Sequence, residues 1–298
     1  MPDYPDDLRE LVDGYLEALS FSAAERTRGL EAAMRYSLLA GGKRIRPVLS
    51  LATARATGLE PESVLPVAAG IELIHTYSLI HDDLPAMDDD ELRRGRPTSH
   101  VVYGEDVAIL SGDGLFAEAL RLVSERQQGP PERVLAALAE LSRATGVDGM
   151  VGGQYIDVTL PTASRSDGEA GPGADELREL HSLKTGRLIA ASVGVTLILA
   201  GVQEAEARAY RAFAAELGVL FQIVDDILDV IGSDEELGKP SGSDARHDKL
   251  TYVSLFGLDR ARELATTSHA KARDALSRVS GDPADLESIT DFIHTRHA

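Results

Sequence analysis

The chain of 298 residues carries 49 acidic and 30 basic side chains, which leaves a formal net charge of -19 at pH 7. This acidity disfavours a nucleic-acid partner, because phosphate backbones are bound by basic surfaces. The chain has no cysteine, which excludes disulfides, thiolate metal ligands and a cysteine nucleophile, and fits a reducing compartment.

The first twenty residues contain acidic side chains and lack the basic region and apolar core of a signal peptide. The longest apolar runs, such as 188–202, are shorter than the roughly eighteen residues of a membrane span. These features predict a cytoplasmic protein without a stable membrane anchor.

Along the chain, apolar residues recur every three or four positions, as at Leu30, Met34 and Leu38. Segments rich in Gly, Pro and Ser, such as 129–131 and 162–174, interrupt this pattern. No interruption shifts the composition enough to mark a second domain. The sequence therefore predicts one all-α domain over residues 1–298.

The segment 41–47 reads GGKRIRP and precedes an expected helix. Its glycines let the backbone approach a ligand closely. Cations beside a helix N-terminus, together with backbone N–H groups, bind anions. The segment therefore predicts an anion site.

A first aspartate cluster, Asp82, Asp83 and Asp88, follows an apolar helical stretch. Carboxylates in such surroundings cost several kcal/mol unless they are neutralised, paired or bound to a metal. His75 shares a helix face with Asp82, and Pro85 ends the helix so that Asp88 can turn back. Alone, this segment also fits a solvated acidic helix end.

A second cluster lies in the apolar segment 221–229, where Gln222, Asp225, Asp226 and Asp229 share one helix face. Oxygen-only ligands favour Mg²⁺, which usually keeps several waters and bridges to substrate phosphates. The two clusters predict two halves of one magnesium site and a substrate that carries phosphate.

Four basic segments complement the two clusters: 92–97, 181–186, 238–240 and 249–252. Each alone is typical of a solvated surface. Together with the acidic clusters, they indicate binding of an anionic substrate.

Segments 41–47, 79–98, 181–186 and 221–229 resemble the signature blocks of the short-chain trans-polyprenyl diphosphate synthases, in particular the bacterial farnesyl diphosphate synthases. The resemblance implies an isoprenoid synthase type I fold, with about ten core helices around a deep central cavity. It also implies a homodimer.

The resemblance further assigns site residues. Three Mg²⁺ ions would bind between the clusters and hold an allylic diphosphate. The main metal ligands would be Asp82, Asp88 and Asp225, supported by Asp83, Asp226 and Asp229. The residues of the allylic site would be Arg93, Lys184, Thr185, Gln222 and Lys239. Those of the isopentenyl diphosphate site would be Lys43, Arg46, His75 and Arg94, with Lys249 as a further basic residue.

In this family, Mg²⁺ and basic side chains stabilise the diphosphate that leaves the allylic carbon. The double bond of isopentenyl diphosphate attacks the resulting cation, and a proton is lost to the released diphosphate. Dipoles of Thr185 and Gln222 would stabilise the cation, while apolar walls exclude water.

Product length depends on the helix before Asp82, along which the growing chain is expected to run. Tyr77 lies five residues earlier, about 7.5 Å deeper, with Ser78 beside it. An aromatic side chain at Tyr77, together with the two extra residues between Asp83 and Asp88, resembles the bacterial farnesyl pattern and predicts a fifteen-carbon product. The alternatives are a geranylgeranyl product and a Tyr77 that is only a core aromatic residue.

Other functions fit parts of the sequence. His75, His81 and Asp82 resemble the ligands of an HD-type metal phosphohydrolase, but that function leaves the second cluster unexplained. A non-catalytic prenyl synthase subunit would be expected to lose one cluster, and a class I terpene cyclase would not need Lys43, Arg46 and Arg94. The segment 112–117 mimics a dinucleotide loop without the surrounding strand and helix.

Overall fold

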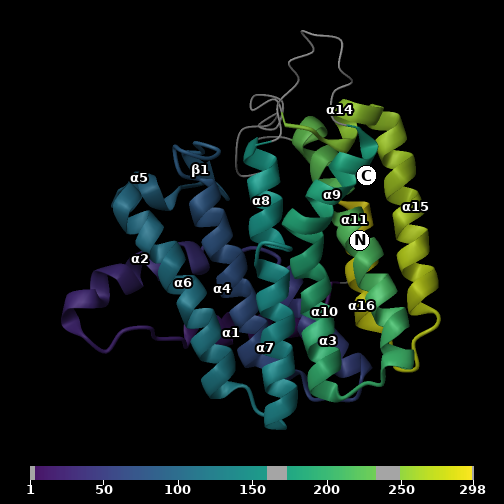
Figure 1. The fold of residues 1–298 in the computed structure, drawn as a ribbon, viewed down its shortest axis with the longest axis horizontal. Helices are drawn as coiled ribbons and strands as arrows, with labels where there is room; N and C mark the ends of the chain where they lie inside the picture. Colours follow the sequence, from purple (N-terminus) through teal and green to yellow (C-terminus); the bar gives the residue numbers. More distant parts are fainter. Residues whose placement is uncertain (1–3, 160–172, 233–248, 297–298) are drawn as a thin grey trace.

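Apolar residues at three- and four-residue spacing form long helices in the computed structural model of the chain (Figure 1). The structure describes residues 4–159, 173–232 and 249–296. Lys239, which the resemblance assigns to the allylic site, lies outside the described residues. So does most of the expected loop at 162–174.

Helices account for nearly all regular structure in these ranges. The α-helices are α1 (Asp6–Glu17), α2 (Arg28–Leu38), α3 (Ile45–Ala56), α4 (Leu65–Asp82), α5 (Ser99–Tyr103), α6 (Glu105–Arg126), α7 (Pro131–Thr145), α8 (Met150–Thr159), α9 (Ala174–His181), α10 (Arg187–Ala200), α11 (Glu204–Ile231), α14 (Tyr252–Phe256), α15 (Leu258–Leu276) and α16 (Ala284–Thr295). The shorter elements are the 3-10 turns η1 (Glu25–Thr27) and η2 (Pro61–Val64), the π-helical turn η3 (Ser182–Gly186), and the antiparallel strands β1 (Leu92–Arg93) and β2 (Arg96–Pro97). This architecture confirms the predicted all-α fold.

Helices α4 and α10 lie in the middle of the bundle (Figure 1). Helix α4 packs against α3 and α6, and α10 packs against α3, α7 and α11. Most residues of both helices are buried because neighbours cover them on several sides. The amphipathic α11 buries Tyr210 and Phe213 and packs against α10 and α15, so the core lies between these helices.

One proline lies at each end of α4, Pro66 in its first turn and Pro85 after its last residue. Pro66 lies in the first turn, where its missing N–H has no helical partner to lose. The helix ends at Asp82 with Asp83 as its C-cap, and Pro85 follows, as predicted. The central helix therefore brings Asp82 and Asp83 to one end of the bundle.

Two helical stretches of the described chain, Pro61–Asp82 and Ala174–Ala200, are long and apolar enough to span a membrane. The longest uninterrupted apolar runs did not predict this result. Most residues in the apolar window of each stretch are buried inside the bundle, as core helices require.

The segment that mimics a dinucleotide loop lies inside α6, so it does not form such a loop. Its glycines serve packing instead. A side chain at Gly112 would overlap the ring of His81, and one at Gly114 would lie 3.0 Å from the sulfur of Met34. His81 uses the space to hydrogen-bond the carbonyl oxygen of Ile109 at 3.0 Å, which ties α4 to α6.

We predict that Gly112→Ala lowers the free energy of unfolding by about 1–3 kcal/mol, the usual cost of overpacking a core. Gly14→Ala is the matched control, because nothing lies within 4 Å of an added methyl group there. That change should stabilise α1 by about 0.5–1 kcal/mol. Urea unfolding followed by circular dichroism measures both, and equal effects of the two changes would contradict the packing role of Gly112.

Candidate active site

The first aspartate cluster is formed by the end of α4 and the turns that follow. The backbone N–H of Asp88 donates to the carbonyl oxygen of Asp82 at 2.8 Å, so the chain turns back as predicted. Asp82 is buried and accepts a hydrogen bond from the Gln154 side chain of α8. Asp83 is also buried and pairs with Arg93 at 2.6 Å. The cluster therefore lies partly inside the protein, where its charges need partners.

The second cluster lies in the C-terminal third of α11. Asp225 is exposed, whereas Asp226 and Asp229 are buried. Asp226 accepts hydrogen bonds from the Gln222 amide and from the backbone N–H of Tyr252, both at 2.7 Å. This cluster thus presents one exposed carboxylate beside two buried ones.

The short segment Lys249–Tyr252 connects the clusters. Nζ of Lys249 donates to Asp88 at 2.8 Å, and the N–H of Tyr252 donates to Asp226. Because two residues only three positions apart each contact a different cluster, the two clusters border one site. Their role in metal binding stays a prediction.

The π-helical turn η3 carries Lys184 and Thr185. Nζ of Lys184 donates to Asp157 of α8 at 2.5 Å. Burial lowers the pKa of Lys184, but Asp82 and Asp157 outweigh it and raise the pKa to about 12. Thr185 Oγ1 donates to the Gln222 side chain at 2.9 Å and links η3 to α11. Such π-helical turns are frequent at functional sites.

The charge of Asp82 is unfavourable in this environment. Burial raises its pKa, as does Asp88, while Lys184, Arg93 and Lys249 lower it, and the result is about 6. A carboxylate that the protein alone leaves under-stabilised is suited to a divalent cation. Among the described residues, no three Asp, Glu or His side chains lie close enough together to hold a metal ion by themselves. Carboxylate oxygens are nevertheless the ligands that Mg²⁺ prefers, and Mg²⁺ usually also binds waters and substrate phosphates.

A second basic group surrounds the loop Gly41–Arg46. The guanidinium of Arg46 lies 3.3 Å from Nε2 of His75 on α4. The guanidinium of Arg94 donates to the carbonyl oxygen of Gly41, so the β1–β2 hairpin and this loop meet. The structure therefore brings Arg46, His75 and Arg94, from three separate parts of the chain, to one loop.

The protonation of this group follows from its burial. Burial and Arg46 hold the pKa of His75 well below its usual value, so its ring is neutral at pH 7. Burial lowers the pKa of Arg46 to about 10, which leaves it cationic at pH 7. The ammonium group of Lys43 lies over the ring of Phe292, 5.1 Å from the ring centroid.

Tyr77 is half-buried between α4 and α6. Its ring meets Phe116 of α6 edge-on at 5.3 Å and His81 at 5.7 Å between centroids. Burial raises the pKa of Tyr77 to about 12, so it is neutral at pH 7. Ser78 donates to the carbonyl oxygen of His75 at 2.9 Å, so its hydroxyl serves α4 itself.

Gln154 and Asp157 are site residues that the sequence reasoning missed. They contact Asp82 and Lys184, respectively. The sequence does contain a pattern that could have indicated them. Two polar residues three positions apart follow Gly152 and Gly153 in a mostly apolar segment. A side chain at Gly153 would overlap the backbone of η3, so this glycine lets α8 approach the site.

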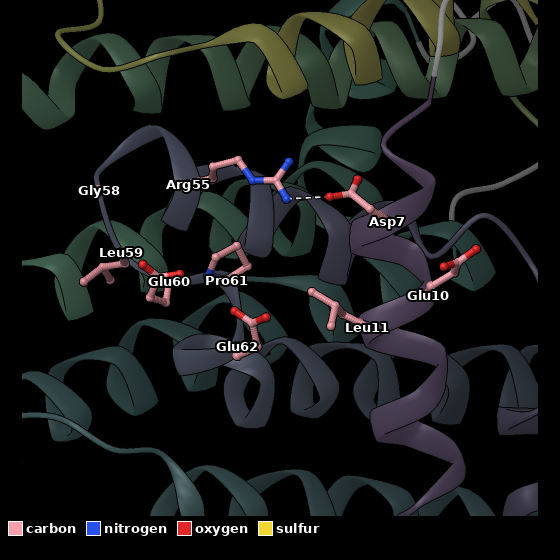
Figure 2. A pocket seen from close by; sticks show the side chains of 9 residues that line it. All are labelled: Asp7, Glu10, Leu11, Arg55, Gly58, Leu59, Glu60, Pro61 and Glu62. Carbon is pink, nitrogen blue, oxygen red and sulfur yellow. Dashed lines mark hydrogen bonds and ion pairs between the residues drawn. The ribbon is translucent and has the colours of Figure 1, made fainter.

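A pocket of about 650 Å³ lies at the opposite end of α4 and is lined by α1, the end of α3 and η2 (Figure 2). Asp82 is about 25 Å away, because α4 rises about 1.5 Å per residue. This pocket is therefore separate from the aspartate clusters. A cavity of about 30 Å³ does adjoin the first cluster and is lined in part by Asp83, Arg93 and Arg94.

Comparisons with known proteins find relatives that match over most of the chain. The family model described as polyprenyl synthetase matches residues 27–293. A farnesyl diphosphate synthase of Geobacillus stearothermophilus is 45% identical over 278 residues, which cover 91% of each chain. The heterodimeric geranylgeranyl pyrophosphate synthase large subunit 1, chloroplastic, of Arabidopsis thaliana is 45% identical over 268 residues, covering 89% of this chain and 71% of that protein.

Among solved structures, a geranyltransferase from Helicobacter pylori complexed with magnesium and isoprenyl diphosphate matches with a TM-score of 0.85 and 32% identity. The match covers 97% of this chain and 94% of that chain. It confirms the isoprenoid synthase type I fold that the resemblance implied.

We predict that Asp82→Asn stabilises the metal-free protein. The pKa of Asp82 is about 6 in the folded state, against 3.8 in the unfolded chain. Ionisation of Asp82 therefore lowers the free energy of unfolding as pH rises from about 4 to about 6. The loss at higher pH is about 3 kcal/mol at most. In EDTA at pH 8, Asp82→Asn should therefore raise the unfolding temperature and flatten its dependence on pH between 4 and 6.

The exposed Asp148 provides the control, and Asp148→Asn should change neither property. An unchanged or lower unfolding temperature for Asp82→Asn in EDTA would show that the buried charge is not a cost to the fold.

Proposed function

The chain belongs to the polyprenyl synthetase family of trans-prenyltransferases, and on this premise we propose that it condenses isopentenyl diphosphate with dimethylallyl and then geranyl diphosphate to give farnesyl diphosphate. The observation that carries the proposal is the pair of aspartate clusters joined by Lys249–Tyr252, with a separate basic group around Gly41–Arg46. This arrangement suits two diphosphates in one reaction.

We propose that Asp82, Asp88 and Asp225 bind Mg²⁺, with Asp83, Asp226 and Asp229 in support, and that three ions bind with substrate. Use of Mg²⁺ follows from the family and from the magnesium-bound structural relative. The bound ions would supply positive charge to the departing diphosphate.

Side chains of the protein would also stabilise charge at the proposed allylic site. Lys184 and Arg93 are held by Asp157 and Asp83, which keeps each cation in place before substrate binds. We propose that both stabilise the leaving diphosphate. The hydroxyl of Thr185 and the amide of Gln222 would direct their dipoles at the allylic cation.

The second diphosphate is proposed to bind Lys43, Arg46 and Arg94. The neutral ring of His75 lies beside Arg46 and can donate a hydrogen bond without adding charge. Isopentenyl diphosphate bound there would present its double bond to the allylic cation. The proton is then lost to the released diphosphate, so no protein base is required.

Farnesyl diphosphate is proposed as the product because of Tyr77. Tyr77 lies about 1.4 helical turns before Asp82, and its ring packs against Phe116 of α6. A growing chain that runs along α4 would meet this pair of aromatic rings. Relatives at 45% identity carry the names of both farnesyl and geranylgeranyl synthases, so geranylgeranyl diphosphate is the second candidate.

The geometry disfavours an HD-type phosphohydrolase. His81 hydrogen-bonds the carbonyl oxygen of Ile109, and His75 lies against Arg46. Both imidazoles are thus engaged away from Asp82. A non-catalytic subunit is disfavoured because both aspartate clusters are complete.

We also propose a homodimer. Exposed apolar side chains recur at helical spacing on α8 and the turn before it, and others lie on α5 and α6, which favours association with a second copy. They are Val147, Val151, Tyr155 and Val158, with Val101, Val102, Ile109 and Leu110. A cytoplasmic location stays a prediction that rests on the sequence alone.

The purified protein should convert isopentenyl diphosphate, with Mg²⁺ and dimethylallyl or geranyl diphosphate, into a fifteen-carbon product identified by chromatography. EDTA should abolish turnover. Failure to condense any of dimethylallyl, geranyl and farnesyl diphosphate would refute the proposed reaction.

In the same assay, Tyr77→Ala should shift the product toward twenty carbons, because removal of the ring opens the path along α4. Tyr77→Phe keeps the ring and is the matched control, so its products should match those of the wild type. Unchanged products from Tyr77→Ala would remove Tyr77 as the limit on chain length.

The dimer is tested by sedimentation equilibrium at micromolar protein. We expect twice the chain mass for the wild type and the mass of one chain for Tyr155→Glu with Val151→Glu. A wild-type protein with the mass of one chain would contradict the proposed interface.

A further inference from the structure

The N-terminal segment contacts the loop that is proposed to bind the second diphosphate. The family model begins at residue 27, so α1 and the residue Tyr4 lie outside the match. Two side chains from this segment nevertheless bind consecutive residues of the loop, Lys43 and Arg44.

The first contact fixes Arg44. Asp13 of α1 accepts a hydrogen bond from Nε of Arg44 at 2.9 Å. The other guanidinium nitrogens donate to Glu72 of α4 at 2.7 Å and to the carbonyl oxygen of Leu38 at 2.8 Å. Arg44 is buried, so its charge depends on these partners.

Arg44 also has a special backbone conformation. Its φ is 52°, in the left-handed region that residues other than glycine rarely adopt. It is the N-cap of α3 and comes directly before the helix that carries Arg46. Its side-chain contacts therefore hold the backbone in a conformation that it would not adopt by itself.

The second contact fixes Lys43. The hydroxyl of Tyr4 donates to the carbonyl oxygen of Lys43 at 2.7 Å. The ring of Tyr4 packs against Phe292 of α16 at 4.9 Å, and the ammonium group of Lys43 lies over that same ring. Tyr4 thus orients both the backbone of Lys43 and the surface on which its side chain rests.

We propose that the segment from Tyr4 to Asp13 positions the loop Gly41–Arg46 for the second diphosphate. Neither Tyr4 nor Asp13 would contact the substrate. Tyr4 and Asp13 would act through Lys43 and Arg44, so that Arg46 and the loop backbone meet the diphosphate without rearrangement. The inference deepens the proposed function and depends on its assignment of isopentenyl diphosphate to this loop.

The competing explanation is that these contacts only hold α1 against α3. The chain contains an internal control for it. Asp7 of α1 pairs with Arg55 at the far end of α3, with 2.5 Å between Oδ2 and the guanidinium (Figure 2). The Asp7 pair joins α1 to α3, as the Asp13 pair joins α1 to the N-cap of α3, but it does not contact the loop.

The experiment compares Tyr4→Phe, Asp13→Asn and the control Asp7→Asn. Isothermal titration calorimetry gives the Kd for isopentenyl diphosphate without the allylic substrate, and steady-state assays give KM for each substrate. For Tyr4→Phe and Asp13→Asn we expect Kd and KM for isopentenyl diphosphate to rise about five-fold, the factor expected for one net hydrogen bond. KM for geranyl diphosphate should stay close to wild type in both variants, as should the unfolding temperature of Tyr4→Phe.

Other outcomes would overturn the proposal. One is an unchanged Kd for isopentenyl diphosphate in Tyr4→Phe and Asp13→Asn. Others are an equal rise in Asp7→Asn, or a parallel rise in KM for both substrates, because each indicates general loosening of the fold.

The calorimetric arm separates this inference from the proposed reaction. If the wild type binds isopentenyl diphosphate but does not condense it, the reaction fails, and the Kd values still decide the role of the segment. If the wild type does not bind it, the loop is not a diphosphate site and the positioning role is overturned.

Discussion

Carboxylate charge buried on core helices is the constraint around which this structure is arranged. Asp82 ends α4 and Asp226 lies on α11, and both helices also build the hydrophobic core. The acids cannot turn toward water without disturbing that core. The protein therefore surrounds them with donors from elsewhere in the chain, such as the Gln154 side chain at Asp82 and the backbone N–H of Tyr252 at Asp226.

The same constraint explains how a chain with a net charge of -19 can bind anionic substrates. Positive charge is gathered locally around the loop Gly41–Arg46, where Arg46 and Arg94 lie. Glu72, buried on α4, pairs with Arg44 and favours the charged forms of Arg46 and Arg94 as well. One carboxylate thus supports a group of arginines, and α4 both carries Asp82 of the first acidic cluster and borders this basic group.

Close helix packing makes the arrangement possible. Gly153 lets α8 approach the π-helical turn η3, which places Asp157 beside Lys184. Gly112 leaves room for His81, the residue before Asp82, to bond α6. These glycines act by the absence of a side chain at positions where two elements meet.

The sequence by itself determined the features that depend on local spacing. Helical periodicity predicted the all-α fold, Pro85 predicted the end of α4, and the turn of Asp88 back to Asp82 followed from both. The aspartate clusters were visible because acids stand out in apolar segments.

Only the tertiary structure decided which distant residues meet. Gln154 reaches Asp82, and Asp13 reaches Arg44, across 72 and 31 residues of sequence, respectively. Sequence spacing carries no record of such pairs, because they depend on how helices pack and not on the period of any one helix. The burial that shifts the pKa of Asp82 has the same origin, since it is set by neighbours from other elements.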